Sequence, residues 1–369
     1  MADLTAGQLS MIANAALDFY LNKGTAFQQQ LQDRPLVAAM ESGAKNFPGG
    51  KGEISVAVQG AYGAGGTNDS LTGFTGDDTV AFFNPTNLAR LSYIWREMHI
   101  GISITHTELK HDGISVVNEM GGTSNHAGRD QTVLVNMWEN KLFDFGERYA
   151  RSLNELLWDD GTSDAKAIHG LRHFLVANPG AGTVGGKDRA TAANAYLRNR
   201  AYTAAYAAAV TGTPALAGHG GDEVTSAAAN GGALIQVLQQ EFRQLRRYGA
   251  KPTKFLAGSD FIGAMEVEMR ANGYYSQNGF RGRQDGAMGG LSFDGIDIVY
   301  DPTLDDLSLA KRAYIFDPRH IFLMKQTGEW RKTHNPARPH DKFVLYRSIT
   351  STGQLVGTQL NGGLVIDIA

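Results

Sequence analysis

The sequence contains no cysteine, which excludes disulfide bonds, thiolate zinc sites and cysteine nucleophiles. It also lacks any uncharged apolar run long enough to cross a bilayer, and its N-terminus lacks the basic-then-apolar order of a secretory signal. Charge is nearly balanced, at a net -3, so no overall basic field is available to drive nonspecific binding of nucleic acid. These absences predict a globular protein made in a reducing cytosol, with no membrane partner.

Glycine, in contrast, is abundant, with 45 residues among 369, against only 10 prolines. A dense cluster lies in VQGAYGAGGTNDSLTGFTGDDTVAFF, residues 58–83, between a predicted strand Glu53–Gln59 and a predicted return strand Thr79–Phe83. Phosphate-binding loops need a helix directly after the glycines, because its first amide groups face the anion. No helical period follows this cluster. Two stretches around Lys51 and Lys187 approach a P-loop pattern but lack its first glycine and its Ser or Thr, so the cluster is expected to form a long hairpin loop.

Three pairs of polar residues are candidates for metal-binding or charge-binding sites. His169 and His173 have the i, i+4 spacing of a metal pair, but no third ligand accompanies them, so turn or surface histidines are the favoured interpretation. Asp159 and Asp160 lie at the end of a predicted helix, where the helix dipole is negative and disfavours carboxylates. A cation from this chain or from another subunit would compensate for this, but a solvated turn is the favoured interpretation. Asp305–Asp306 is interpreted as a solvated loop in the same way. No metal site is predicted.

A basic run, Arg243–Lys251, could contact phosphate, although a solvated helix face is the favoured interpretation. The sequence contains no GxSxG elbow, HExxH motif or EF-hand loop. We therefore expect no catalytic residue, no cofactor and no enzymatic activity.

The most regular helical pattern spans residues 130–158, where large apolar residues recur at three- and four-residue intervals. Asp130 is the predicted N-cap and Gly161 the predicted stop. At 1.5 Å per residue this helix would be roughly 40 Å long, far longer than the average helix of a globular domain. It is predicted to be a strut for an extended body.

The remaining pattern predicts a mixed α+β chain. Residues 7–22 read as an amphipathic helix, and the stretch from there to Gly50 reads as an arm without a core element. The other predicted elements are an alternating strand with Met98, Ile100, Ile102 and Ile104 on one face, an Ala-rich helix near 190–210, helices at 233–248 and 260–272 around a strand Lys254–Ala257, and several strands in the last third.

This order of parts resembles the major capsid protein of tailed bacteriophages, which has the Hong Kong 97 fold. The resemblance lies in element order and length, over nearly the whole chain, and in no short motif. It implies the following division: an N-terminal arm at 1–50, an extended β-hairpin loop at 51–85, a peripheral domain at 86–165 with the spine helix 130–158, an axial domain at 166–290, and strands at 291–369 that return to both domains.

The resemblance also implies a function. The chain would assemble, as hexamers and pentamers, into the icosahedral head shell of a tailed phage, around double-stranded DNA that it contacts without sequence specificity. It would be made in the bacterial host's cytoplasm and located in the virion. Scaffolding, if there is any, would be a separate protein, because the arm begins almost at Met1. Portal and decoration proteins would be further partners. Residues 60–78 contain no lysine, so the lysine–asparagine cross-link of some members is not expected.

Two alternatives stay open: a shell protein of an encapsulin-like nanocompartment, which has the same fold, and, in a different class, an α+β enzyme that binds phosphate. The connection 60–78 favours a shell protein of either kind over the enzyme. Loops longer than about 12–15 residues are uncommon inside compact domains, so this one is expected to be functional or disordered. Its apolar residues can hardly be buried by its own hairpin, and the arm carries an apolar stripe as well. The predicted inter-subunit contacts are Tyr62, Leu71, Phe74, Leu9, Ile12 and Leu17.

Overall fold

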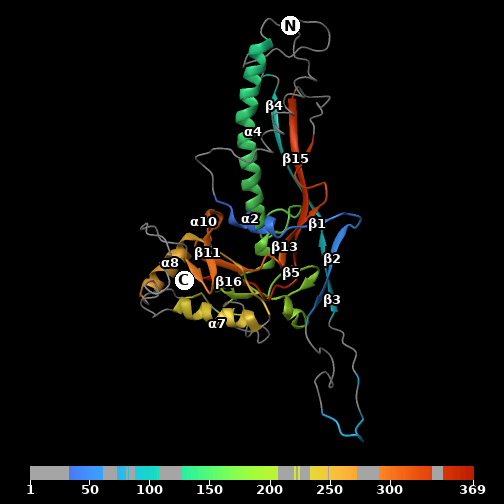
Figure 1. The fold of residues 1–369 in the computed structure, drawn as a ribbon, viewed down its shortest axis with the longest axis vertical. Helices are drawn as coiled ribbons and strands as arrows, with labels where there is room; N and C mark the ends of the chain where they lie inside the picture. Colours follow the sequence, from blue (N-terminus) through green and yellow to red (C-terminus); the bar gives the residue numbers. More distant parts are fainter. Residues whose placement is uncertain are drawn as a thin grey trace. The chain divides into compact units, whose positions relative to one another are not determined.

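The structure is a computed structural model that describes residues 33–60, 73–79, 82, 88–105, 107, 127–206, 220–221, 223–224, 233–247, 249–271, 291–334 and 344–369. The chain divides into two compact units, whose elements are labelled in Figure 1. Unit 1 comprises residues 1–32, 97–155 and 326–352, and unit 2 comprises residues 33–96, 156–325 and 353–369. Helices and runs of successive strands are both present along the chain, which agrees with the predicted mixed α+β class.

Unit 2 is built on a sheet of seven strands. In spatial order they are β10 (Ser292–Phe293), β11 (Ile296–Tyr300), β9 (Lys254–Ala257), β12 (Arg312–Phe316), β16 (Leu364–Asp367), β7 (Arg200–Tyr202) and β8 (Gly220–Gly221). β9 runs parallel to β11 and antiparallel to β12, and β16 runs parallel to β7. Strands from three distant parts of the sequence therefore share this sheet.

One face of this sheet is covered by α7 (Ala233–Arg247) and α8 (Ser259–Ala271). Phe255, Ala257 and Ile315 project from the strands into the buried cluster that contains the apolar sides of both helices. Residues that alternate with them point the other way, where the Tyr314 ring lies 5.0 Å from that of Trp158. The sheet is thus buried on both faces, as the continuous apolar strand sequences require.

A buried ion pair joins the sheet to α7. Arg200 of β7 donates through Nη2 to Glu241 Oε1 of α7 at 2.9 Å, and the Tyr202 hydroxyl donates to the same oxygen at 3.0 Å. Both Arg200 and Glu241 are buried. Burial, with Glu241 close by, raises the pKa of Tyr202 to about 12. This network places β7 in the sheet, although its sequence predicts part of an Ala-rich helix.

The other elements of unit 2 surround this sheet. They are α2 (Pro35–Ser42), β1 (Lys45–Phe47), β2 (Glu53–Gln59), β3 (Leu88–Ile94), α5 (Leu171–Phe174), β5 (Thr183–Val184), β6 (Lys187–Asp188), the 3-10 helix η1 (Ala192–Leu197), α10 (Pro302–Asp306) and β13 (Ile321–Gln326). The prediction that residues up to Gly50 lack a core element is wrong. Leu36, Ala39 and Met40 of α2 are buried, on a stripe too short to stand out in the sequence.

Unit 1 is centred on four elements, three of which continue into unit 2: β4 (Arg96–Thr105), α4 (Ala127–Trp158) and β15 (Val344–Gly357), with β14 (Lys332–His334) as the fourth. β14 pairs antiparallel with β15, with Thr333 opposite Ile349. On α4 the Tyr149 hydroxyl lies 2.8 Å from Ser351 Oγ of β15. None of the described helices is both long and apolar enough to cross a membrane.

Several predicted elements are confirmed. The long helix, the 233–248 helix, the 260–272 helix and the strand between them correspond to α4, α7, α8 and β9, and the alternating run after Met98 is β4. α4 begins at Ala127, so the prediction of Asp130 as its N-cap is wrong. The Ala-rich helix at 190–210 is also wrong, because η1 ends at Leu197 and β7 follows.

Candidate subunit interface

The β2–β3 hairpin has one face that packs into unit 2. On this face Ile54, Leu91 and Tyr93 are buried, with exposed fractions of 3%, 0% and 3%. The Tyr93 hydroxyl donates a hydrogen bond of 2.8 Å to the carbonyl of Gly357, and its burial raises the pKa of the phenol well above the ordinary value. Its ring lies 5.9 Å from that of Phe174. We call these three residues the anchored face of the hairpin.

Glycines allow the backbone to approach the base of the hairpin closely. Gly185, in the turn between β5 and β6, has φ +56°, and a Cβ atom there would lie 2.6 Å from Leu91 Cβ. Its carbonyl accepts the backbone N–H of Ser92 at 3.1 Å. At the end of β2, a Cβ on Gly60 would lie 2.6 Å from the Tyr196 ring. Side chains at these positions would displace the anchored face.

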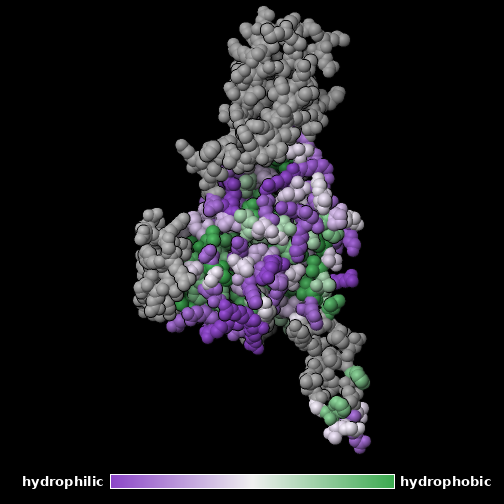
Figure 2. Space-filling view, viewed as in Figure 1, coloured by the Kyte–Doolittle hydropathy of each residue, from purple (hydrophilic) through white to green (hydrophobic). Residues whose placement is uncertain are grey.

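The opposite face and the connection leave large apolar side chains in solvent. Leu88 and Ile94 of β3 are 70% and 55% exposed, while Phe74 and Phe82 in the connection are 71% and 93% exposed. We call these four residues the exposed apolar set. Figure 2 shows hydrophobic side chains on the described part of the connection. Four large apolar side chains exposed on one hairpin and its connection make this region the candidate surface for contact with another molecule.

A short turn orders the connection beside Phe74. The backbone N–H of Asp78 donates to the Thr75 carbonyl at 2.8 Å, and the Thr75 N–H donates to Asp78 Oδ2 at 2.7 Å. Asp side chains often accept hydrogen bonds from nearby backbone N–H groups in turns. This turn presents Phe74 without covering it.

The predicted return strand Thr79–Phe83 is wrong. β2 pairs instead with Leu88–Ile94, in a register that places Glu53 opposite Ile94 and Gln59 opposite Leu88. Thr79 and Phe82 are described and have no strand geometry. β2 ends at Gln59 and β3 begins at Leu88, so the two paired strands are further apart in the sequence than predicted.

Of the six predicted contact residues, Phe74 is described, and its exposure matches the expectation that the hairpin leaves it unburied. Tyr62, Leu71, Leu9, Ile12 and Leu17 lie outside the described residues. Sequence reasoning missed the other members of the exposed apolar set. Two of them, Leu88 and Ile94, sit on the polar side of an alternating strand, a signal that becomes visible only once the strand is placed correctly.

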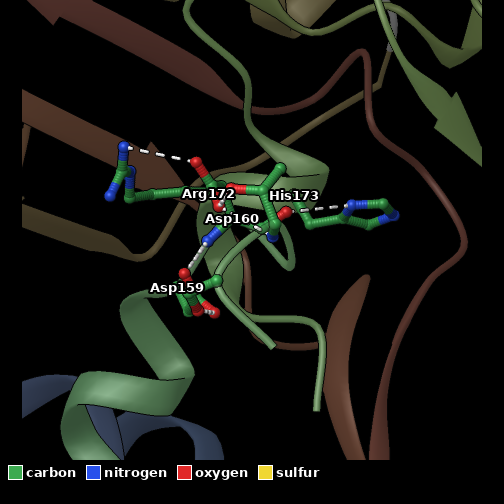
Figure 3. A network of polar contacts seen from close by, with 6 residues as sticks. Asp159, Asp160, Arg172 and His173 are labelled. Carbon is green, nitrogen blue, oxygen red and sulfur yellow. Dashed lines mark hydrogen bonds and ion pairs between the residues drawn. The ribbon is translucent and has the colours of Figure 1, made fainter. Parts of the chain in front are cut away.

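A second polar site follows the end of α4 (Figure 3), where Asp160 lies between Asp159, Arg172 and His173. The Asp160 N–H donates to Asp159 Oδ1 at 2.8 Å, and the Arg172 guanidinium lies 3.7 Å from Asp160 Oδ2. A hydrogen bond from the Thr162 hydroxyl is the largest cause that lowers the pKa of Asp160, with Arg172 contributing further. The cation that the sequence left open comes from the same chain, so Asp160 belongs to a turn with defined partners.

The histidines of this site lie against each other with tilted rings and are half-buried, which corrects their interpretation as turn or surface residues. The rings of His169 and His173 lie 4.2 Å apart. Burial, and then His169 and Arg189, lower the pKa of His173 to about 4. Arg189 is buried and donates through Nη2 to the carbonyls of His173 and Phe174 at 3.0 and 2.8 Å. The described residues hold no group of three His, Asp or Glu side chains that could bind a metal ion.

Asp305–Asp306 is also more ordered than predicted, because it lies within α10. Asp305 accepts the Ser259 N–H at 3.0 Å and the Tyr300 hydroxyl at 2.7 Å. Asp301 caps α10 through the Thr303 N–H at 3.0 Å and accepts Trp158 Nε1–H at 2.9 Å. Asp301 and Asp305 therefore tie elements of unit 2 together.

Neither P-loop-like stretch that the structure describes has P-loop geometry. Lys51 follows two glycines with positive φ and leads into β2, a strand and not a helix. Lys187 follows Gly185 and Gly186, both at positive φ, which form the tight turn of the β5–β6 hairpin. The glycine cluster at 63–66 lies outside the described residues.

Comparison with solved structures identifies the fold. The asymmetric unit of the cyanophage A-1(L) capsid superposes with a TM-score of 0.61 at 16% identity, over 94% of this chain and 96% of that one. The mature capsid of bacteriophage PhiM1 gives 0.52 at 8% identity, over 94% and 90%, and the capsid of a native GTA particle gives 0.51 at 13%, over 94% and 96%. No protein-family model and no curated protein matches the sequence. The chain therefore has the fold of tailed-phage capsid proteins, which confirms the Hong Kong 97-type resemblance.

Proposed function

We propose that this chain is the major capsid protein of a tailed double-stranded DNA bacteriophage and assembles into the icosahedral shell of the virion. The fold is that of capsid proteins along almost the whole chain, and three such capsids match over at least nine-tenths of both chains. A fold alone does not define a function, so the proposal needs a surface on this chain that acts in assembly.

The observation that carries the proposal is the hairpin with its two unlike faces. The anchored face ties its base to unit 2, whereas the exposed apolar set projects large side chains that nothing in the described chain buries. Burying these side chains against a neighbouring subunit would stabilise an assembly by roughly 25 cal/mol for each Å² of apolar area removed from water.

The division into domains follows from this proposal. Unit 1, with α4 as its spine, corresponds to the peripheral domain, and the seven-stranded sheet with α7 and α8 corresponds to the axial domain. The extended loop runs through β3 to Ile94 and so is longer than the 51–85 predicted. Residues 1–32 remain the proposed N-terminal arm, whereas α2 and β1 belong to the body of unit 2. Scaffolding, portal and decoration proteins remain proposed partners, and packaging of DNA remains the proposed task.

Assembly of the purified full chain tests the proposal. We expect capsomers or megadalton particles by size-exclusion chromatography and negative-stain microscopy, with the chain alone or with a co-expressed scaffold. Replacing Phe74 and Phe82 together by Ser should abolish assembly and leave the far-UV circular dichroism unchanged. The matched control is Asp77→Ser, an exposed polar change in the same turn, which should assemble normally.

Two results would count against the proposal. A chain that stays a compact monomer under all these conditions contradicts the shell function. Particles that form and enclose protein cargo, with no nucleic acid detectable after nuclease treatment and phenol extraction, would favour the nanocompartment alternative.

A further inference from the structure

The outward face of α7 carries positive charge without any exposed carboxylate. Arg243, Arg246 and Arg247 are exposed and follow one another at three- and four-residue spacing, and Lys251 is exposed just beyond the helix. We call these four residues the α7 basic surface. Figure 2 shows strongly hydrophilic residues over α7. The single acidic residue between 233 and 254 is Glu241, which is buried against Arg200 and so faces away from solvent.

The rest of the same face is neutral and polar. Gln236, Gln239 and Gln240 are exposed one turn or more before the arginines, on the same side of the helix. The opposite side contributes Leu234, Leu238 and other apolar residues to the buried cluster of unit 2. The helix is therefore fixed by its apolar side, and its outward side presents amides followed by guanidinium groups.

One carboxylate reaches this surface from another element. Asp294, in the turn between β10 and β11, forms an ion pair with Arg246. Arg243 bonds through Nε to the carbonyl of Gln239, at 3.2 Å, which leaves its charge uncompensated by an acid. Asp297 is exposed on β11, which pairs with β10 near this turn. In the part of the chain that the structure describes, Arg243, Arg247 and Lys251 form no ion pair with a carboxylate.

α8, the other helix that packs on this face of the sheet, does not have the same charge on its exposed side. α8 lies beside α7 on the same sheet face and exposes Asp260 and Val267, with Glu266 half-buried. The whole chain has 37 acidic and 34 basic residues, so an ordinary exposed helix of this protein should carry both signs. The dipole of α7 accounts for cations in its last turn, such as Arg246 and Arg247, but for neither Arg243 nor Lys251.

We propose that the α7 basic surface binds the phosphate backbone of double-stranded DNA packaged by this chain. Guanidinium groups form bidentate hydrogen bonds with phosphate oxygens, and amide side chains donate to the same oxygens without reading the base sequence. A local single-sign surface acts over about one Debye length, about 10 Å at 0.1 M salt, so the near-zero net charge of the chain does not oppose it. This inference rests on the proposed shell function, because it takes the enclosed DNA as the partner.

Salt-dependent DNA binding tests the inference. The probe is a short fluorescein-labelled duplex of mixed sequence, titrated with the purified full chain between about 50 and 200 mM salt, where phosphate contacts lose affinity steeply. The test variant is Arg243→Gln, Arg247→Gln and Lys251→Gln together, which leaves the Arg246–Asp294 ion pair in place. The control removes the same charge from three exposed lysines elsewhere, Lys166→Gln, Lys187→Gln and Lys311→Gln.

We expect the test variant to bind the duplex about tenfold or more weakly at the lowest salt, and its log–log salt slope to fall by about 1 for each cation removed. The control should keep the wild-type slope. An unchanged slope in the test variant, or an equal loss in the control, would overturn the inference. So would displacement of the duplex by polyglutamate at equal charge, because the surface would then bind acidic protein segments.

Microscopy of the same samples separates this inference from the proposed function. If particles form and the slope is unchanged, the DNA-binding surface is wrong and the shell function stands. If no particles form but the slope falls as expected, the shell function fails: the α7 basic surface then binds duplex DNA, but not as DNA enclosed by a shell, and that part of the inference is overturned. A reconstruction of the particles that places α7 on the outer surface would overturn the inference independently of any substitution.

Discussion

The two faces of the β2–β3 hairpin have the same backbone and opposite environments. On β3, Leu91 is completely buried, whereas Leu88, three residues earlier, is 70% exposed. Both are leucines in one strand, so neither composition nor strand propensity accounts for the difference. The strand's alternation does, since the odd positions from Leu91 to Tyr93 point into unit 2 and Leu88 and Ile94 point away.

This difference indicates two uses for apolar side chains in one element. The anchored face contributes to the stability of the subunit and is complete within one chain. The exposed apolar set contributes nothing to that stability and becomes favourable only when a second molecule covers it. Substitutions on the two faces should therefore separate folding from assembly.

The largest expected effect is on the anchored face. Leu91→Ala removes buried methyl groups next to Gly185 and should lower the free energy of unfolding by about 2–5 kcal/mol. The measurement is urea denaturation followed by tryptophan fluorescence. A loss below about 1 kcal/mol would show that the hairpin base is not part of the folded core. The anchored face would then not differ from the exposed face in its contribution to stability.

A smaller effect should come from pH, through His173, which packs against Phe174 next to the anchored face. The His173 ring packs edge-on against Phe174, which contacts Tyr93, and burial lowers the pKa of His173 to about 4. The unfolded chain has the ordinary pKa near 6.5, so below that pH it binds a proton that the folded chain resists. Stability is then fully present above about pH 6.5 and is lost as pH falls towards 4.

Between pH 7 and pH 5 we expect the free energy of unfolding to fall by on the order of 1 kcal/mol. The low carboxylate pKa values, such as that of Asp160, act below this window, because they lie under an ordinary value of 3.8. His173→Gln should flatten the profile between these two pH values, whatever it does to stability at pH 7. A variant profile as steep as that of the wild type would assign the pH dependence to other groups.

The contrast between faces also explains what could be predicted from the sequence. α7, β9 and α8 follow from local signals, because their apolar periods and the glycine at 249 depend only on nearby residues. β3 was missed because Leu88 and Ile94 on its outer face interrupt the polar–apolar alternation that marks a half-buried strand. The exposed apolar residues that make the hairpin a candidate interface are therefore also the reason why β3 could not be predicted.

β7 was missed for a different reason. Arg200 is buried in the central sheet through its ion pair with Glu241, which lies 41 positions further along the chain. Local helix propensity is high in this Ala-rich stretch, but the long-range pairing determines its structure. The sequence singles out Phe74 as a candidate because a long connection with apolar residues is unusual by itself. The turn beside it depends on the Thr75–Asp78 hydrogen bonds, which no sequence pattern marks.

The smallest expected change in stability comes from Leu88→Ala on the exposed face. Because this side chain is already in water, the free energy of unfolding should stay within about 0.5 kcal/mol of the wild-type value. Assembly should weaken, since the lost methyl groups would have been buried by a neighbouring subunit, and sedimentation velocity would show a higher critical concentration for particles. The decisive readout is the pair of leucines taken together: Leu91→Ala lowers the urea midpoint, and Leu88→Ala lowers only the yield of particles. If Leu88→Ala instead shifted the urea midpoint as strongly as Leu91→Ala, the outer face would be covered by the chain's own residues, and the hairpin would have no free surface to offer to a second subunit.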